Sequence, residues 1–146
     1  MVRIIPKTIL TSAFVLAASV IVAFPAGASN GTEKVPVLRF PNGSCATGAV
    51  PNSGASVGFA VINKNGSGSV SAEVSLKNGL PNHTYSVSLV QTPSGENCFA
   101  TEATLTTNAE GNGNVHVDEA LLPGSTDAFV LLQTPGDFLA SPDVVF

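Results

Sequence analysis

The chain has few of the residues on which catalysis and cofactor binding depend. Its 146 residues include two histidines, two cysteines, one tyrosine and no tryptophan, and only 11% of them are charged. A zinc or copper centre needs several ligands, and two histidines are too few to build one. No serine stands in a Gly-x-Ser-x-Gly setting, and no glycine-rich run has the spacing that binds phosphate. We therefore expect a protein that is not an enzyme and has no cofactor and no metal.

Positive charge is also sparse. After residue 28 the sequence holds four basic residues against ten acidic ones, a net charge of −6. The four are scattered, as Lys34, Arg39, Lys64 and Lys77. Nucleic-acid binding needs cations clustered against phosphate, so we expect no nucleic-acid partner.

The first 28 residues form a secretory signal peptide by their pattern. Arg3 and Lys7 precede an uncharged run over 8–24, and small residues follow, up to Ala28. This order of basic, apolar and small residues predicts cleavage between Ala28 and Ser29. The alternative is a retained membrane anchor, but a 17-residue run diluted by Thr, Ser and Ala is at the lower limit for crossing a bilayer. We expect a secreted, extracytoplasmic protein with no membrane span after cleavage.

Two cysteines remain in the exported part, Cys45 and Cys98. An even number of cysteines in an oxidising compartment favours a disulfide, and two allow only one pairing. Closing a loop of this length stabilises a fold by roughly 4 kcal/mol on the chain-entropy model. The alternative is a pair of free thiols that bind a metal or act in redox chemistry, which the wide spacing and the lack of a Cys-x-x-Cys motif disfavour.

From residue 35 onward the dominant hydrophobic period is two. Val70, Ala72, Val74 and Leu76, for example, alternate with polar residues. Such alternation is typical of antiparallel strands with one buried and one wet face. No window after the signal peptide shows a helical stripe, so we expect essentially no helix. The expected strands lie near 35–40, 57–63, 68–77, 83–91, 98–107, 113–118, 126–133 and 143–146.

An internal repeat suggests how these strands combine. Residues 63–70 match 108–115 at four of eight positions, and 80–93 match 122–135 at seven of fourteen. The alternative is convergence, because hairpin turns reuse Asn and Gly. Two three-stranded meanders, one in each repeat, would have to pack face to face to bury their apolar sides.

The resulting expectation is an all-β domain over 35–146, preceded by a short flexible N-terminus at 29–34. Its architecture is predicted as an antiparallel two-sheet sandwich of about seven or eight strands. One strand, Phe129 to Leu132, is apolar on both faces. That pattern indicates either a central strand covered on both sides or a sticky edge, and we favour the central strand.

Two segments resemble known folds. The stretch from Leu80 and Pro81 to Tyr85 resembles the tyrosine corner of immunoglobulin-like sandwiches. The turn that ends at Gly111, followed by Leu122-Pro-Gly, resembles the hairpin and turn of prealbumin-like repeats in bacterial surface proteins. These resemblances imply an immunoglobulin-like sandwich and say little about function.

The two histidines do not form a site by themselves. His83 falls in the Leu-Pro turn, where we expect a solvated side chain. His116 shares the polar side of its strand with Asp118, and this pair is either a solvated face or two ligands of a cation.

Three functions remain in competition. The leading one is a secreted, non-enzymatic immunoglobulin-like module with a binding or structural role at the cell exterior, whose partner is an unknown protein, glycan or small apolar ligand. The alternative is an extracellular carrier of a small apolar ligand, because the glycine-rich hairpin, the Leu-Pro turn and the terminal apolar strand resemble the neocarzinostatin-type apoproteins. The third is protease inhibition by the loop around Cys45, from Asn42 to Asn52.

Overall fold

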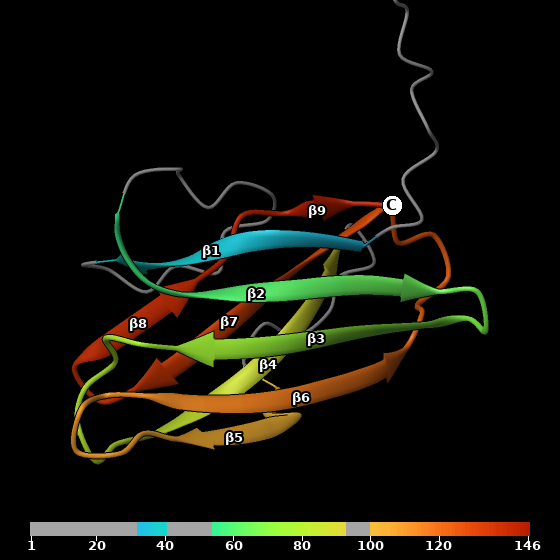
Figure 1. Cartoon of the computed structure of the whole chain (residues 1–146). Coiled ribbons are helices and arrows are strands. Elements are labelled where there is room, and N and C mark those ends of the chain that lie inside the picture. Colours follow the sequence, from blue (N-terminus) through green and yellow to red (C-terminus); the bar gives the residue numbers. More distant parts are fainter. Residues whose placement is uncertain (1–31, 41–53, 93–99) are drawn as a thin grey trace, which may run out of the picture.

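The computed structural model describes residues 32–40, 54–92 and 100–146, which form nine antiparallel strands in one sheet (Figure 1). The strands are β1 (Thr32–Phe40), β2 (Ala55–Asn65), β3 (Ser69–Leu76), β4 (Thr84–Thr92), β5 (Ala103–Thr106), β6 (Gly113–Ala120), β7 (Asp127–Thr134), β8 (Asp137–Ala140) and β9 (Val144–Val145). The expectation of an all-β protein is confirmed. Within the described residues, no helix is long and apolar enough to cross a membrane.

The predicted two-sheet sandwich is wrong. Eight strands follow one another in the order β5-β4-β7-β8-β1-β2-β3-β6, while β9 pairs with β7. The two end strands lie side by side, since a Cβ added at Gly113 of β6 would come within 2.6 Å of a methyl carbon of Leu105 in β5. The single sheet is therefore nearly closed into a barrel.

The cause of this difference is the pairing of β1 with two neighbours. β1 pairs with β2 along its length, and its last three residues also pair with β8. This second pairing, centred on Arg39 opposite Leu139, joins β5-β4-β7-β8 to β1-β2-β3-β6. Without it, the same strands would form two separate sheets, one of four strands and one of five, because β9 stays paired with β7. We call the β1–β8 pairing the seam.

The predicted meanders are wrong as well. Consecutive strands β3 and β4 do not pair. Instead β3 pairs with β6 and β4 pairs with β7, so strands from equivalent places in the two repeats lie next to each other. The strand β8 was not predicted at all. It follows a tight turn at Pro135-Gly136, where Gly136 has a φ of +86°, a conformation that suits glycine in such a turn.

The inward-facing side chains fill the barrel with one apolar core. Alternate residues of each strand contribute to it, as the period of two predicted, and the members are no more than 5% exposed. They are Val35, Val37, Val57, Ala60, Ile62, Val70, Ala72, Val74, Leu76, Tyr85, Val87, Leu89, Leu105, Val117, Ala128, Val130, Leu132, Leu139 and Val144. Each Val or Leu buried in this way stabilises the fold by about 1.5–3 kcal/mol relative to an exposed one.

The expectation of a central buried strand at Phe129 to Leu132 is confirmed. β7 lies between β4 and β8, and these four residues are between 0 and 3% exposed. Val130 and Leu132 face the barrel core, whereas Phe129 and Leu131 belong to a second apolar cluster with Val90 of β4. This second cluster lies on the outer face of the sheet, because side chains of successive strand residues point to opposite sides.

A β-bulge in β2 brings an extra residue into the core. The register against β1 shifts so that Val57 has no partner, and its side chain is only 1% exposed. At the adjacent Gly58, an added Cβ would lie 2.2 Å from the backbone oxygen of Ser75. Only glycine lets β2 and β3 approach this closely.

We predict that Gly58→Ala destabilises the protein by about 2 kcal/mol or more, because the new methyl group collides with backbone that cannot move aside. Gly66→Ala is the matched control, since a Cβ at Gly66 would meet no atom within 4 Å. Urea unfolding of both variants measures the difference. Equal stability of the two variants would contradict the close packing at the bulge.

Several predictions fall outside the described residues. These are the signal peptide over 1–28 with its cleavage between Ala28 and Ser29, and the disulfide between Cys45 and Cys98. They stay predictions.

Candidate functional site

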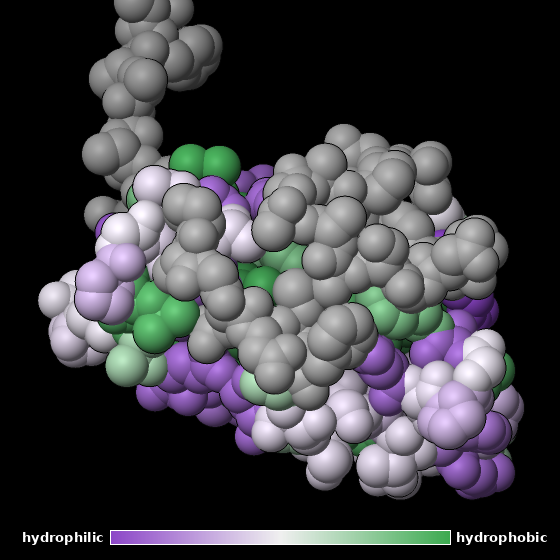
Figure 2. All heavy atoms as spheres, turned by 180° about the vertical axis from the view of Figure 1, so that it is seen from behind, coloured by the Kyte–Doolittle hydropathy of each residue, from purple (hydrophilic) through white to green (hydrophobic). Residues whose placement is uncertain are grey.

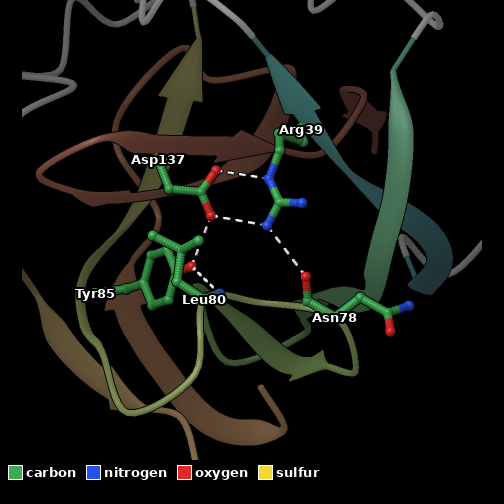
Figure 3. Close-up of polar contacts among 5 residues, drawn as sticks. All are labelled: Arg39, Asn78, Leu80, Tyr85 and Asp137. Carbon is green, nitrogen blue, oxygen red and sulfur yellow. Dashed lines mark hydrogen bonds and ion pairs between the residues drawn. The ribbon is translucent and has the colours of Figure 1, made fainter. Parts of the chain in front are cut away.

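A buried polar network lies at the seam (Figure 3). The guanidinium of Arg39 donates two hydrogen bonds to Asp137, from Nε to Oδ1 at 2.7 Å and from Nη2 to Oδ2 at 2.9 Å. The hydroxyl of Tyr85 donates to Oδ2 of Asp137 at 2.7 Å and accepts a bond from the backbone N–H of Leu80 at 2.8 Å. Nη2 of Arg39 also donates to the backbone oxygen of Asn78 at 3.1 Å. We call these residues the seam network.

The network connects three strands and a turn. Arg39 is in β1, Asp137 begins β8 and Tyr85 is in β4. The side chain of Asp137 is 4% exposed and that of Arg39 is 36% exposed, so the carboxylate is buried and the guanidinium lies at the rim. The contact from Leu80 to Tyr85 is the kind that a tyrosine corner makes, and here it occurs in a barrel.

The network fixes the charge of each member. Burial by itself would raise the pKa of Asp137, but the hydrogen bonds from Arg39 and Tyr85 and the charge of Arg39 outweigh it and lower that pKa. Its hydrogen bond to Asp137 raises the pKa of Arg39, and burial together with the same carboxylate raises the pKa of Tyr85. All three groups thus keep one protonation state around neutral pH. General acid–base catalysis needs a group that titrates near the working pH, so this arrangement supports the fold and supplies no proton-transfer group.

Sequence reasoning missed Arg39 and Asp137. Arg39 appeared there only as one of four scattered cations, and Asp137 not at all. The signal that could have found them is a charged residue at an inward position, Arg39 in β1 and Asp137 in β8. Arg39, for example, has the same parity as Val35 and Val37, which face the core. That signal requires knowing that β8 exists, which the sequence did not reveal.

The polar groups with catalytic or ligand potential lie elsewhere, on the outer face of β1, β2, β3 and β6. Cross-strand pairing arranges twelve outward residues in three rows of four. The rows are Thr32–Asn63–Ser71–Asp118, Lys34–Val61–Glu73–His116 and Pro36–Phe59–Ser75–Asn114. We call these twelve residues the polar sheet face. None of them is buried, and nine carry hydrogen-bonding groups.

The predicted histidine candidates are both at the surface. Nδ1 of His116 lies 2.7 Å from Oε1 of Glu73, and the two side chains are 55% and 65% exposed. Asp118 lies in a different row, opposite Ser71. The described residues contain no group of three or more side chains arranged to hold a metal ion. His83 is exposed in its turn, with Nδ1 2.7 Å from the backbone oxygen of Pro81.

A second buried polar side chain, that of Gln91, lies near the other end of β4. Gln91 is 1% exposed, and its amide nitrogen donates to the backbone oxygen of Ala120 at 2.9 Å. Its amide oxygen accepts a bond from the backbone N–H of Leu122, also at 2.9 Å. Gln91 therefore connects β4 to the end of β6 and has a structural role.

The carboxyl group of Asp143 lies in an environment that disfavours its charged form. Its Oδ1 is buried and has no hydrogen-bond partner in the described part of the chain. Burial raises the pKa of Asp143, and the negative charge of Asp127 raises it further. Ionisation of this carboxyl is therefore more costly in the folded protein than in the unfolded chain.

We predict that Tyr85→Phe lowers the free energy of unfolding by about 2 kcal/mol. The variant keeps the ring but leaves the N–H of Leu80 without its acceptor and removes one donor from Asp137, and unsatisfied buried groups carry a penalty of this size. Thr84→Val removes an exposed hydroxyl from the same strand and should change stability by less than about 0.5 kcal/mol. Denaturant unfolding measures both, and a Tyr85→Phe protein as stable as the control would contradict the role of the network.

We predict that Asp143→Asn raises the thermal midpoint at pH 7. The folded-state pKa of Asp143 lies above its ordinary value of 3.8, so the charge destabilises the fold at neutral pH. This penalty falls as the pH drops through the folded-state pKa, because the native protein then binds more protons than the unfolded chain. The gain from Asn should therefore vanish near about pH 3. Asp118→Asn, on the exposed polar sheet face, is the control. A gain that persists unchanged at low pH would count against this cause.

In comparisons with known proteins, no family model, no curated protein and no solved structure matches this chain.

Proposed function

We propose that this protein is an exported, non-enzymatic binding module that recognises a hydroxyl-rich glycan through the polar sheet face. The observation that supports this function is the uncovered grid of twelve outward side chains, most of which donate or accept hydrogen bonds. Paired strands hold the grid in a fixed register, so its groups are arranged before any ligand arrives. Export rests on the predicted signal peptide.

The chemistry of the face favours a glycan over other macromolecules. Carboxylates and amides such as Glu73, Asn63 and Asn114 bind pairs of neighbouring hydroxyl groups, and Phe59 adds an apolar surface. Protein interfaces depend most on Trp, Tyr and Arg, and the face contains none of these. It contains one lysine, Lys34, whose Nζ lies 3.9 Å from the centre of the Phe59 ring, so it offers no cationic patch for phosphate.

The remaining described features give less support to the other functions. A carrier of an apolar ligand needs an apolar cleft, whereas the inward-facing side chains pack against one another in one buried cluster. The seam network, in which the pKa values of Arg39, Tyr85 and Asp137 are all shifted away from neutral, keeps fixed protonation states. We therefore place recognition on the outer surface of the barrel.

The test is an NMR titration of the mature chain, beginning at Ser29, with a panel of soluble oligosaccharides. We expect saturable shifts in the amide signals of Glu73, His116 and Asn114. Glu73→Ala should weaken binding by about 10-fold or more, since one hydrogen bond to a charged group contributes about 1.5–3 kcal/mol and every 1.4 kcal/mol is tenfold. Glu110→Ala is the matched control, because it removes an exposed acid in the turn between β5 and β6.

Two results would contradict the proposal. One is the absence of saturable shifts with every oligosaccharide in the panel. The other is binding that Glu73→Ala and Glu110→Ala weaken equally, which would place recognition away from the polar sheet face.

A further inference from the structure

Asparagine is followed directly by glycine at five places in the sequence, and three of these pairs lie in the described residues. They are Asn65-Gly66, Asn78-Gly79 and Asn112-Gly113. At such a pair the backbone nitrogen of the glycine can attack the side-chain amide of the asparagine, because glycine has no side chain to obstruct the approach. The attack needs a backbone N–H that is free of hydrogen bonds and a chain that can rotate. The surroundings of each pair therefore decide whether it reacts in the folded protein.

The structure protects Asn78-Gly79 from this reaction. Gly79 is buried, and its N–H donates a hydrogen bond to the backbone oxygen of Gly111 at 3.0 Å. The backbone of Asn78 is held on both sides. Its N–H donates to the oxygen of Val57 at 3.1 Å, and its own oxygen accepts a bond from Arg39, also at 3.1 Å. The attacking nitrogen is therefore engaged, and the chain around it is fixed.

Asn112-Gly113 is fixed by a turn and a strand. The N–H of Asn112 donates to Oδ1 of Asn108 at 2.9 Å, and the oxygen of Asn112 accepts the N–H of Asn108, also at 2.9 Å. Gly113 begins β6 and pairs with Leu76 of β3. A Cβ added at Gly113 would lie 2.6 Å from a methyl carbon of Leu105, so the backbone is also closely packed. This pair is held in place as well.

Asn65-Gly66 lies in the hairpin between β2 and β3, and its backbone is open. Residues 66–68 are all exposed, and a Cβ added at Gly66 would meet no atom within 4 Å. Within the described part of the chain, the N–H of Gly66 makes no backbone hydrogen bond in this turn. Figure 1 shows the hairpin reaching beyond the end of β6, and Figure 2, which views the molecule from behind, shows the same end at its left edge as weakly hydrophilic surface.

Two hydrogen bonds orient the side-chain amide of Asn65 beside this open backbone. Its Nδ2 donates to Oγ of Ser69 at 3.0 Å, and its Oδ1 accepts a bond from Nδ2 of Asn63. Attack at Cγ places negative charge on Oδ1, and a donor aimed at that oxygen stabilises the charge as it forms. The N–H of Gly68 donates to the backbone oxygen of Asn65 at 3.2 Å, which closes the turn and leaves Gly66 between its fixed ends.

We propose that Asn65 is a modification site at which the folded protein deamidates spontaneously through a cyclic imide formed with Gly66. The backbone nitrogen of Gly66 bonds to Cγ of Asn65, and the bond from Cγ to Nδ2 breaks. The proton that the backbone nitrogen loses leaves with the amide group as ammonia. Water then opens the ring at one of its two carbonyl carbons, which gives aspartate or isoaspartate at position 65. The whole reaction consumes one water and releases one ammonia.

The modification changes the end of the polar sheet face. Each event adds one negative charge at neutral pH and removes the donor that Asn65 offers to Ser69. The oxygen that accepts the bond from Asn63, a member of the polar sheet face, becomes part of a carboxylate. The isoaspartate form also lengthens the main chain by one carbon at the residue that pairs β2 with Ser69. None of this depends on whether the face binds a glycan.

The test is peptide mapping by mass spectrometry after the wild-type mature protein has been incubated in mildly alkaline buffer. Trypsin cleaves after Lys64 and Lys77, so residue 65 lies in a peptide of its own, 65–77, apart from Asn78 and Asn112. A mass gain of about 1 Da in this peptide marks the conversion. In the folded protein we expect Asn65 to convert at least about tenfold faster than the other two asparagines. In urea-unfolded protein, all three should convert at similar rates.

Gly66→Ala obstructs the ring closure, while the open space at Gly66 lets the fold accept the methyl group. This variant should slow the conversion of Asn65 by about tenfold or more, which corresponds to a barrier higher by about 1.4 kcal/mol. Ser67→Ala is the matched control, because it changes the same turn without touching the attacking nitrogen. Its conversion rate should stay within about twofold of the wild type.

Any of three results would overturn the proposal. Equal rates at the three described asparagines in the folded protein would show that the open hairpin gives no selectivity. Conversion at position 65 in the unfolded chain alone would show that the fold protects this site. A Gly66→Ala protein that converts as fast as the wild type would exclude the cyclic imide. Glycan binding is measured separately, on freshly prepared protein, so these results leave it untouched.

Discussion

Arg39 and Asp137 face each other across the seam, where only three residues of β1 pair with β8. This short pairing is what joins β5-β4-β7-β8 to β1-β2-β3-β6 in one sheet. A paired carboxylate and guanidinium hold their positions through two parallel hydrogen bonds, which fixes both distance and orientation. Tyr85 then connects the pair to β4 on the far side of β7, so the network reaches from one half of the barrel to the other.

The hydrogen bonds of this network indicate that its charged groups stabilise the fold. A carboxylate that is only 4% exposed must be compensated, and Arg39 and Tyr85 supply the donors that do so. Removing either donor leaves the buried carboxylate of Asp137 with an unmet hydrogen bond, which disfavours the closed barrel relative to an open one. Reactive chemistry would need a member free to change its protonation state, and the hydrogen bonds prevent that.

The class of the fold and most strands could be predicted from the sequence, because alternation with a period of two is a local property of each strand. Seven of the expected strands differ from the observed ones by a few residues at most. The strand expected at 98–107 was too long, since β5 covers only Ala103–Thr106. The central position of Phe129 to Leu132 could also be predicted, because a strand that is apolar on both faces is more often a covered central strand than an exposed edge.

The pairing of the strands could not be predicted from such local patterns. The repeat indicated two equivalent units, but equivalent units can pack face to face or pair edge to edge, and local patterns do not distinguish the two. The decision depends on β8, whose four residues, Asp137 to Ala140, are too short to show a period. The site residues Arg39 and Asp137 were missed for the same reason, since they come together only when the seam forms.

The barrel presents two outer surfaces of opposite character, although its strands all belong to one sheet. The polar sheet face is not buried and is rich in hydrogen-bonding groups, whereas Val90, Phe129, Leu131 and Ala140 form a buried apolar cluster on the outer face of β4, β7 and β8. A single sheet can support both because each strand contributes its inward residues to one shared core and leaves its outward residues free to differ.

The pairing of β1 with β8 can be measured directly by cross-strand nuclear Overhauser contacts and amide hydrogen exchange in the mature protein. The barrel predicts backbone contacts between Arg39 and Leu139 and between Leu38 and Ala140, with slowly exchanging amides in this pairing. Absence of these contacts together with rapid exchange on the facing edges of β1 and β8 would show two separate sheets and contradict the account.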